Sequence, residues 1–208
     1  MPVFKVTAAE MLGGRSQIHF ATPALERGFH KLKRQKAREF AVTAHAEQCY
    51  GDEPYVTHLE AVVRVLEDFA FDNDYLIAGW LHDVLEDTKK TFADIEAEFG
   101  KWVASVVSAV SGGGERAAHV ASIYQKIAAL PEAAAVKLAD RIANVEACKA
   151  GDKHAARYHR EHVEFAKVIE PHVPAEMWQR YLDALAICGG PQPAEGSCPK
   201  SHQGDVRA

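Results

Sequence analysis

The stretch "LHDVLEDT", residues 81–88, places one histidine and three carboxylates within a very short segment. The residues that lead into it, "YLIAGWLH", are almost wholly apolar and predict a buried helix. Acidic groups at the end of such a helix are costly to bury unless a cation or hydrogen bonds compensate them. His82 and Glu86 are four residues apart, as are Asp83 and Asp87, so on one helix they occupy two adjacent faces. The four side chains can therefore converge on one wall of a cleft.

A bound divalent cation would supply the positive charge that this cluster lacks. Two further ligand candidates lie elsewhere: His58 follows a loop, and Asp140 lies in "VKLADRIANV", on an otherwise apolar helix face. Histidine combined with carboxylates suits Mn²⁺, Fe²⁺, Co²⁺ or Zn²⁺. An alternative needs no metal: the histidine and acids of the first stretch would form local hydrogen bonds, and Asp140 would pair with Lys137 or Arg141. Spacing alone leaves both interpretations open.

The chain has 208 residues, which suits a single domain with a sizeable core. Helical periodicity recurs along it without an alternating strand pattern of useful length, so we expect an all-α bundle of about eight or nine helices. Residues 1–21 are expected to be an N-terminal extension, and residues 22–189 the folded domain. Residues 190–208, rich in proline, glycine and charge, are expected to form a disordered tail.

Composition indicates a globular cytoplasmic protein. The four cysteines form no C-x-x-C pair, which is typical of reduced thiols. No signal peptide is recognised, and no apolar run approaches the roughly 20 residues that cross a bilayer, so we expect no membrane partner. The net charge of −5 argues against binding to a nucleic acid duplex. The one basic segment, "HKLKRQKAR", residues 30–38, is interpreted as a solvated helix face, with the rim of a polyphosphate site as the alternative.

Three blocks of the sequence, taken in order, resemble the RelA/SpoT-type alarmone hydrolases of the HD-domain phosphohydrolase superfamily. The blocks are "AHAEQCYGDEPYVTHLEAVVRVL", "AGWLHDVLEDTKKTFADIEAEFG" and "VKLADRIANV". They carry the patterns E-P-Y-x-x-H, L-H-D-x-x-E-D-T and K-L-A-D-R-x-x-N. A histidine–aspartate pair alone is common, whereas this ordered combination is specific. The resemblance covers roughly residues 35–150 and implies an HD-domain helical bundle.

The resemblance also implies a site and a reaction. One metal ion, usually Mn²⁺ in this family, would be held by four residues: His58, His82, Asp83 and Asp140. Glu86 and Asp87 would orient and activate the attacking water, and Asn144 would contact the nucleotide. The implied reaction removes pyrophosphate from the 3′ position of guanosine tetra- or pentaphosphate. The expected partner is thus a phosphorylated purine nucleotide, and oligomerisation is left open.

The first block departs from the family pattern. Two basic residues often follow its glutamine in the family, and here those positions are Cys49 and Tyr50. Tyr50 can still stack on a base, and Lys137 and Tyr158 are further candidates for substrate contact. The departure keeps two alternatives open. One is an HD-type phosphatase or phosphodiesterase acting on another nucleotide, and the other is a metal-stabilised nucleotide-binding module without turnover.

Overall fold

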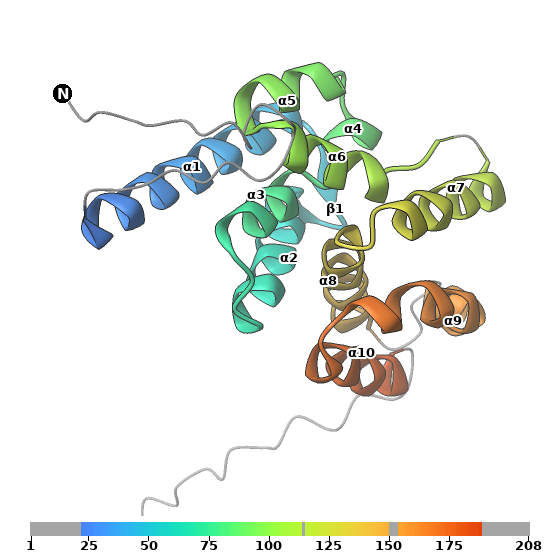
Figure 1. Cartoon of the computed structure of the whole chain (residues 1–208). Helices are drawn as coiled ribbons and strands as arrows, with labels where there is room; N and C mark the ends of the chain where they lie inside the picture. The colour runs from blue at the N-terminus through green and yellow to red at the C-terminus, as the bar shows by residue number, and fades with distance from the viewer. Residues whose placement is uncertain (1–21, 114, 150–153, 189–208) are drawn as a thin grey trace, which may run out of the picture.

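The computed structural model describes residues 22–113, 115–149 and 154–188, and they are almost wholly helical (Figure 1). The helices are α1 (Pro23–Ala44), α2 (Val56–Asp68), α3 (Asn73–Leu81), α4 (Val84–Asp87), α5 (Phe92–Phe99), α6 (Lys101–Val110), α7 (Arg116–Ala129), α8 (Ala133–Glu146), α9 (Ala155–Ile169), the short 3₁₀ helix η2 (Glu170–His172) and α10 (Ala175–Ile187). The prediction of an all-α fold is confirmed. The predicted N-terminal extension and C-terminal tail lie outside the described residues.

Polar side chains start several helices at the positions that local chemistry favours. The Thr22 hydroxyl accepts a hydrogen bond from the backbone N–H of Leu25, and proline takes the first position of α1. Asp72 caps α3 in the same way. Thr91 and Asp94 form a capping box at α5, each satisfying a backbone N–H of the other. The boundaries of these helices are therefore set locally.

Helix α8 lies at the centre of the bundle and packs against α2, α3, α6, α9 and α10. It is rich in alanine, so neighbouring helices can approach it closely, and most of its residues are buried. Two of the buried residues are charged: Asp140 and Arg141 are only 8% and 6% exposed. Charges at the centre of a bundle require compensation, so α8 carries a site as well as a core.

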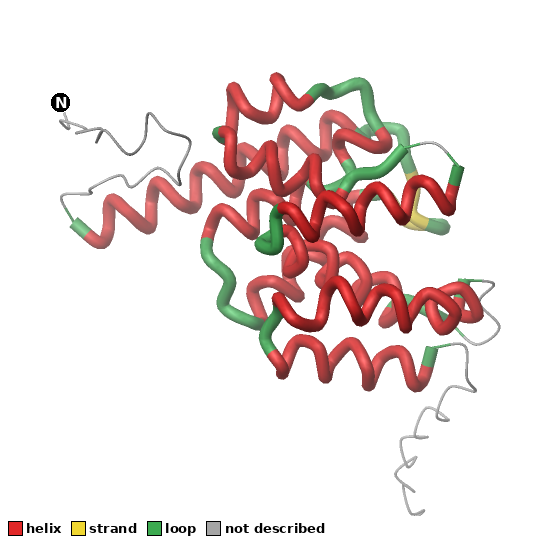
Figure 2. Tube along the Cα trace, turned by 45° about the vertical axis from the view of Figure 1, so that its right-hand side comes forward, coloured by secondary structure: helices red, strands yellow, loops and turns green. Residues whose placement is uncertain are grey.

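A two-stranded antiparallel ribbon interrupts the helices between α1 and α2, within a segment that lacks helical periodicity. Its strands are β1 (Cys49–Tyr50) and β2 (Glu53–Pro54), with Tyr50 opposite Glu53. Gly51 has φ +63°, a conformation that glycine adopts without strain. Figure 2 shows the ribbon confined to one edge of the molecule. The turn leads directly into the first turn of α2.

Among the described helices, none combines the length and the apolar character that a bilayer crossing requires.

Candidate active site

The four predicted metal ligands come from three helices that pack on one another. His58 lies in the first turn of α2, and Asp140 lies in the middle of α8. His82 and Asp83 lie at the junction where α3 ends and α4 begins. Because α8 packs against both α2 and α3, all four side chains meet in the interior.

The break at His82–Asp83 corrects one expectation, since the sequence pattern predicted a single helix through this region. Consecutive side chains of one helix diverge by about 100°, which would point the two residues in different directions. At the junction both residues stay in the right-handed helical region of φ and ψ, with Asp83 shifted to φ −96° and ψ −4°, and His82 Nε2 lies 2.9 Å from Asp83 Oδ2. The backbone carbonyl of Asp83 then accepts from the N–H groups of Glu86 and Asp87 and starts α4.

Three of the four residues, His58, His82 and Asp83, offer ligand atoms that all lie within 4.8 Å of one another. His58 Nε2 lies 3.6 Å from Asp83 Oδ2 and 3.4 Å from Asp140 Oδ1. His82 Nε2 lies 3.8 Å from Asp140 Oδ1. Two ligand atoms that each bind one ion at about 2.1 Å lie roughly 3.0–3.4 Å apart for coordination angles of about 90–110°. The spacing of His58, His82 and Asp83 therefore fits a divalent cation, and Asp140 Oδ1 faces the two histidines of this set.

His82 provides the clearest test of whether a cation belongs there. Its Nδ1 is 2.9 Å from the carbonyl oxygen of Gly79, an acceptor that requires the ring proton on Nδ1. Its Nε2 is buried and has no hydrogen-bond partner of good geometry among the described residues, although Asp83 lies close. In the neutral ring the lone pair of Nε2 thus faces two carboxylates. A cation between them turns this repulsion into attraction.

Protons offer the other form of compensation. Burial lowers the pKa of His82, but Asp83 and Asp140 outweigh it and raise this pKa to about 9. Burial raises the pKa of Asp83, yet the facing His82 brings it down to about 2. The pKa of Asp140 also falls well below its usual range, because Lys137 and the histidines overcome the effect of burial. Both carboxylates therefore stay charged, and the centre attracts protons as well as metal ions.

The metal-free interpretation of Asp140 is also partly realised. Its Oδ2 accepts a hydrogen bond from Lys137 Nζ at 2.8 Å, while Oδ1 faces the two histidines. Arg141 pairs with Glu161 instead, at 3.0 Å. The ion pair with Lys137 and a role as metal ligand use different oxygens, so they are compatible.

Glu86 and Asp87 project from α4 beside the cluster and are more exposed than its members. Glu86 Oε2 accepts a hydrogen bond from the backbone N–H of Gly112 at 3.0 Å, and Oε1 lies 3.4 Å from His119 Nε2. The Tyr55 hydroxyl donates to Asp87 Oδ2 at 3.1 Å and to Asp83 Oδ2 at 2.6 Å. Each acid is therefore held in place by a different part of the chain.

Sequence reasoning assigned no role to Tyr55, Gly112 or His119. Tyr55 is part of the E-P-Y pattern, which was a signal that could have been used. Gly112 and His119 gave no such signal, because their relation to Glu86 exists only in three dimensions. A Cβ atom at Gly112 would lie 2.5 Å from His119 Nδ1, so the histidine can approach only because this residue is glycine.

The predicted substrate residues fall into two groups. Tyr50 lies against the centre: its ring stacks on His58 at 4.7 Å, and its hydroxyl donates to Asn144 Oδ1 at 2.8 Å. Asn144 in turn donates to the side chain and the backbone carbonyl of Asp140. Lys137 of α8 and Tyr158 of α9 line the same cavity as Asn144. The hydrogen bonds of Tyr50 and Asn144 thus connect β1 to the buried acid of α8.

A cavity of about 100 Å³ adjoins Asp140, and Lys137, Asn144 and Tyr158 contribute to its wall. The remaining charges on its wall are mostly cationic, from Arg141 and Arg157. Nη1 of Arg141 and Nε of Arg157 are buried donors without a hydrogen-bond partner in the described ranges. Each guanidinium has another partner, Glu161 for Arg141 and Tyr158 for Arg157, so one donor of each is left over. A cationic wall beside a metal-suited cluster favours a bound phosphate. Tyr158 itself is buried, and its hydroxyl accepts from Arg157 at 3.0 Å.

Known proteins are similar to this chain in sequence and in fold. An alignment over 124 residues is 36% identical to the guanosine-3′,5′-bis(diphosphate) 3′-pyrophosphohydrolase of Aquifex aeolicus (strain VF5), covering 56% of this chain and 18% of the relative. Another, 43% identical over 83 residues, matches the bifunctional (p)ppGpp synthase/hydrolase SpoT of Escherichia coli (strain K12), covering 39% of this chain and 12% of that protein. The chain therefore matches less than a fifth of the length of either relative.

A solved structure, described as a metazoan ortholog of SpoT that hydrolyzes ppGpp and plays a role in starvation responses, has the same fold. It superposes with a TM-score of 0.63 at 24% identity and covers 74% of this chain and 94% of its own. The family model for the HD domain, a fold that binds divalent metals, matches residues 37–165. This range contains the whole His–Asp cluster, both neighbouring acids and the cationic cavity. The chain belongs to the HD-domain family.

Proposed function

We propose that residues 22–189 form a divalent-metal-dependent hydrolase that removes the 3′-pyrophosphate from guanosine 3′,5′-bis(diphosphate). The observation that carries this proposal is the position of the cationic cavity, whose unsatisfied Arg141 and Arg157 donors lie beside the metal-suited cluster at Asp140. A site for a cation next to a site for an anion is the arrangement that phosphoryl chemistry requires. The activity for which the relatives are named supplies the particular substrate.

The metal ion would be held by four residues: His58, His82, Asp83 and Asp140. Mn²⁺ is the ion we propose, with Fe²⁺, Co²⁺ and Zn²⁺ as alternatives that the same mixed donor set can accept. When bound, such an ion lowers the pKa of coordinated water and offsets negative charge on phosphoryl oxygens. The protein has to hold the ion, position the water and bind the phosphates.

Glu86 is the group we assign to proton transfer from the attacking water. It is not part of the ligand cluster, it is accessible, and Gly112 and His119 fix both of its oxygens. Asp87 shares the Tyr55 hydroxyl with Asp83, so it is positioned relative to the cluster and orients the water from the other side. His119 is a positioning residue in this scheme, because it acts through Glu86.

The cavity is large enough for a phosphate group but too small for a nucleotide. We therefore assign Lys137, Arg141 and Arg157 to the phosphates, with Tyr158 holding Arg157 in place. Burial lowers the pKa of Lys137, but Asp140 more than restores it, so the lysine keeps its charge. Asn144, which lines the same cavity, and Tyr50, which donates to it, would contact the nucleoside.

One observation favours a second candidate, a phosphatase or phosphodiesterase acting on another nucleotide. Tyr50 replaces a residue that is often basic in the family, and its hydroxyl occupies the oxygen of Asn144. Both changes lie where the nucleoside would bind. They affect which nucleotide is accepted and leave the metal chemistry unchanged.

The test uses the purified chain, stripped of metal and then supplied with Mn²⁺. Guanosine tetraphosphate is compared with GDP, which lacks the 3′-pyrophosphate, and with a panel of 3′- and 5′-phosphorylated nucleotides. Pyrophosphate and phosphate are measured separately, and Glu96→Gln, an exposed acid of α5, serves as the control for Glu86→Gln. Release of pyrophosphate from the tetraphosphate alone supports the proposal. Turnover confined to another nucleotide selects the second candidate, and metal binding without any turnover overturns both.

A further inference from the structure

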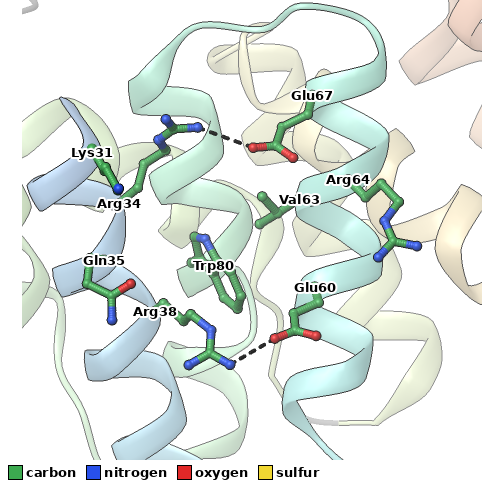
Figure 3. Close-up of a pocket in the computed structure, with 9 residues that line it drawn as sticks. All are labelled: Lys31, Arg34, Gln35, Arg38, Glu60, Val63, Arg64, Glu67 and Trp80. Atoms are coloured by element: carbon green, nitrogen blue, oxygen red, sulfur yellow. Dashed lines mark hydrogen bonds and ion pairs between the residues drawn. The ribbon is translucent and has the colours of Figure 1, made fainter. Parts of the chain in front are cut away.

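A second charged feature lies between α1 and α2, away from the metal-suited cluster (Figure 3). Both helices pack on α3, and a groove of about 300 Å³ runs between them. Trp80 of α3 and Val63 of α2 form its floor. Glu60, on the rim, lies two residues after His58 and so about 200° around the axis of α2. The groove and the cluster therefore use opposite faces of the same helix.

Cations dominate the rim of this groove. Lys31, Arg34 and Arg38 recur at helical spacing along one face of α1, and Arg64 contributes from α2. The basic segment found in the sequence, residues 30–38, therefore does not face the groove as a whole. Lys36 points to α5, where it pairs with Glu98.

Two carboxylates bridge the groove without neutralising it. Arg34 Nη1 lies 3.2 Å from Glu67 Oε1, and Arg38 Nη2 lies 2.9 Å from Glu60 Oε1. The Arg38 guanidinium also lies over the Trp80 ring, 5.6 Å from its centroid. Four cations line the groove against two carboxylates, which leaves a surplus of two positive charges, and the Arg64 guanidinium extends from α2 on the side away from α1 (Figure 3).

The surplus belongs to Lys31 and Arg64. Neither makes a hydrogen bond or an ion pair with any residue that the structure describes. Both carboxylates are accessible, with side-chain exposures of 43% for Glu60 and 50% for Glu67. Exposed ion pairs contribute little to stability, so these glutamates can turn into water when another anion arrives.

We propose that this groove binds an anion that carries several phosphate groups, such as a nucleoside polyphosphate or an inorganic polyphosphate. Arg34 and Arg38 lie one turn apart and would exchange their carboxylates for phosphate oxygens, which guanidinium groups bind in the same bidentate way. Lys31 and Arg64 supply the attraction that no resident anion uses. This site is separate from the cavity at Asp140, which residues of α7, α8 and α9 line.

The experiment measures binding of inorganic tripolyphosphate and of GTP to the full chain by calorimetry, with EDTA present so that no divalent ion takes part. Two groove variants are compared with the unmodified chain: Arg34→Gln/Arg38→Gln, and Lys31→Gln/Arg64→Gln. The second removes only cations without partners, so it breaks no described ion pair. The control, Lys101→Gln/Lys149→Gln, makes the same change in net charge at exposed positions outside the groove.

Both groove variants are expected to lose at least about tenfold in affinity for tripolyphosphate, because two charge-assisted contacts disappear in each. The control is expected to stay within twofold of the unmodified chain. Equal losses in the groove variants and the control, or no loss in either groove variant, would overturn the proposal. The two probes separate the sources: tighter binding of GTP indicates a nucleotide, and equal binding indicates that the phosphate chain alone is recognised. An Arg157→Gln variant is expected to keep the binding of tripolyphosphate in the groove, because Arg157 lies in the cavity at Asp140.

Discussion

Helix α2 carries ionic groups on two opposite faces, and the charges on the two faces are compensated differently. On the outer face, Glu60 and Glu67 each meet an arginine of α1, and all four side chains are accessible to water. On the inner face, His58 meets Asp83 and Asp140 in a place that water hardly reaches. The two outer carboxylates are each paired with an arginine of α1. The inner carboxylates, in contrast, outnumber the fixed cations that face them.

The difference shows which charges the fold needs and which serve a ligand. Outer pairs can separate at small cost, because water replaces the lost partner. The inner charges cannot separate in this way, because a buried charge without compensation costs much free energy. The inner face therefore requires a bound cation, whereas the outer face permits a bound anion but does not require one. Each of the following experiments tests one side of this contrast.

The largest effect is expected from Asp140→Asn. In the unmodified chain, Mn²⁺ at about 100 times its dissociation constant would stabilise the fold by about 2.7 kcal/mol. For a domain of this size that corresponds to a rise in melting temperature of roughly 5–10 °C. The variant keeps the shape of the side chain but removes its charge, so the rise on adding Mn²⁺ should vanish.

The measurement is thermal unfolding with and without Mn²⁺, and the quantity compared is the increment. A lower baseline for Asp140→Asn, which also leaves Lys137 without its carboxylate, does not affect that comparison. Asp183→Asn, at an exposed position on α10, is the matched control and should keep the full increment. A full increment in Asp140→Asn would mean that the buried acid is not a metal ligand.

Glu86→Gln should separate catalysis from metal binding. Removal of a general base typically lowers turnover by about 10²–10⁴-fold, while the thermal increment from Mn²⁺ should persist because Glu86 lies outside the ligand cluster. Turnover is measured with saturating Mn²⁺ and guanosine tetraphosphate, alongside Glu96→Gln. If both variants keep normal turnover, the proton is transferred by another group and the assignment of Glu86 fails.

Much of the inner face could be anticipated from the sequence, for a physical reason. A lone acid on an apolar helix face, such as Asp140, must be buried, and the His82–Asp83 pair ends an apolar helix. Burial forces such groups to find compensation, so their pattern singled them out, and the resemblance to the HD-domain family then implied a shared site. The break between α3 and α4 could not be read in the same way, because the residues on both sides of it favour helix.

The partners of Glu86 were beyond the reach of sequence patterns. Gly112 lies two residues after the end of α6 and His119 lies on α7, so only the packing of the folded chain brings them to α4. The outer face has the same limit. Periodicity shows that Arg34 and Arg38 share one side of α1, but nothing local reveals that Glu60 and Glu67 lie opposite.

A smaller loss of activity is expected when Glu86 is kept but its contact with the His119 ring is removed. His119→Leu removes the ring that faces Glu86, and Gly112→Ala should displace the same ring by its added Cβ. Each should lower kcat by about 10–100-fold, the size of one charge-assisted hydrogen bond, and leave KM little changed. His119→Gln, whose amide can still donate to Glu86, should recover part of that loss. A rise in KM with normal kcat in all three variants would instead place His119 on the substrate.

The smallest effect is expected on the outer face, where a double-mutant cycle of Arg34→Gln and Glu67→Gln measures the coupling of one bridge. The two side chains are 37% and 50% exposed, so solvent screens them and the coupling free energy should be about 0–1 kcal/mol by chemical denaturation. A coupling above about 2 kcal/mol would break the contrast between the two faces. It would mean that Glu67 is held as firmly as a buried group, and that an incoming phosphate could not easily take its place on Arg34. A coupling near zero leaves the guanidinium available, which the proposed polyphosphate site requires.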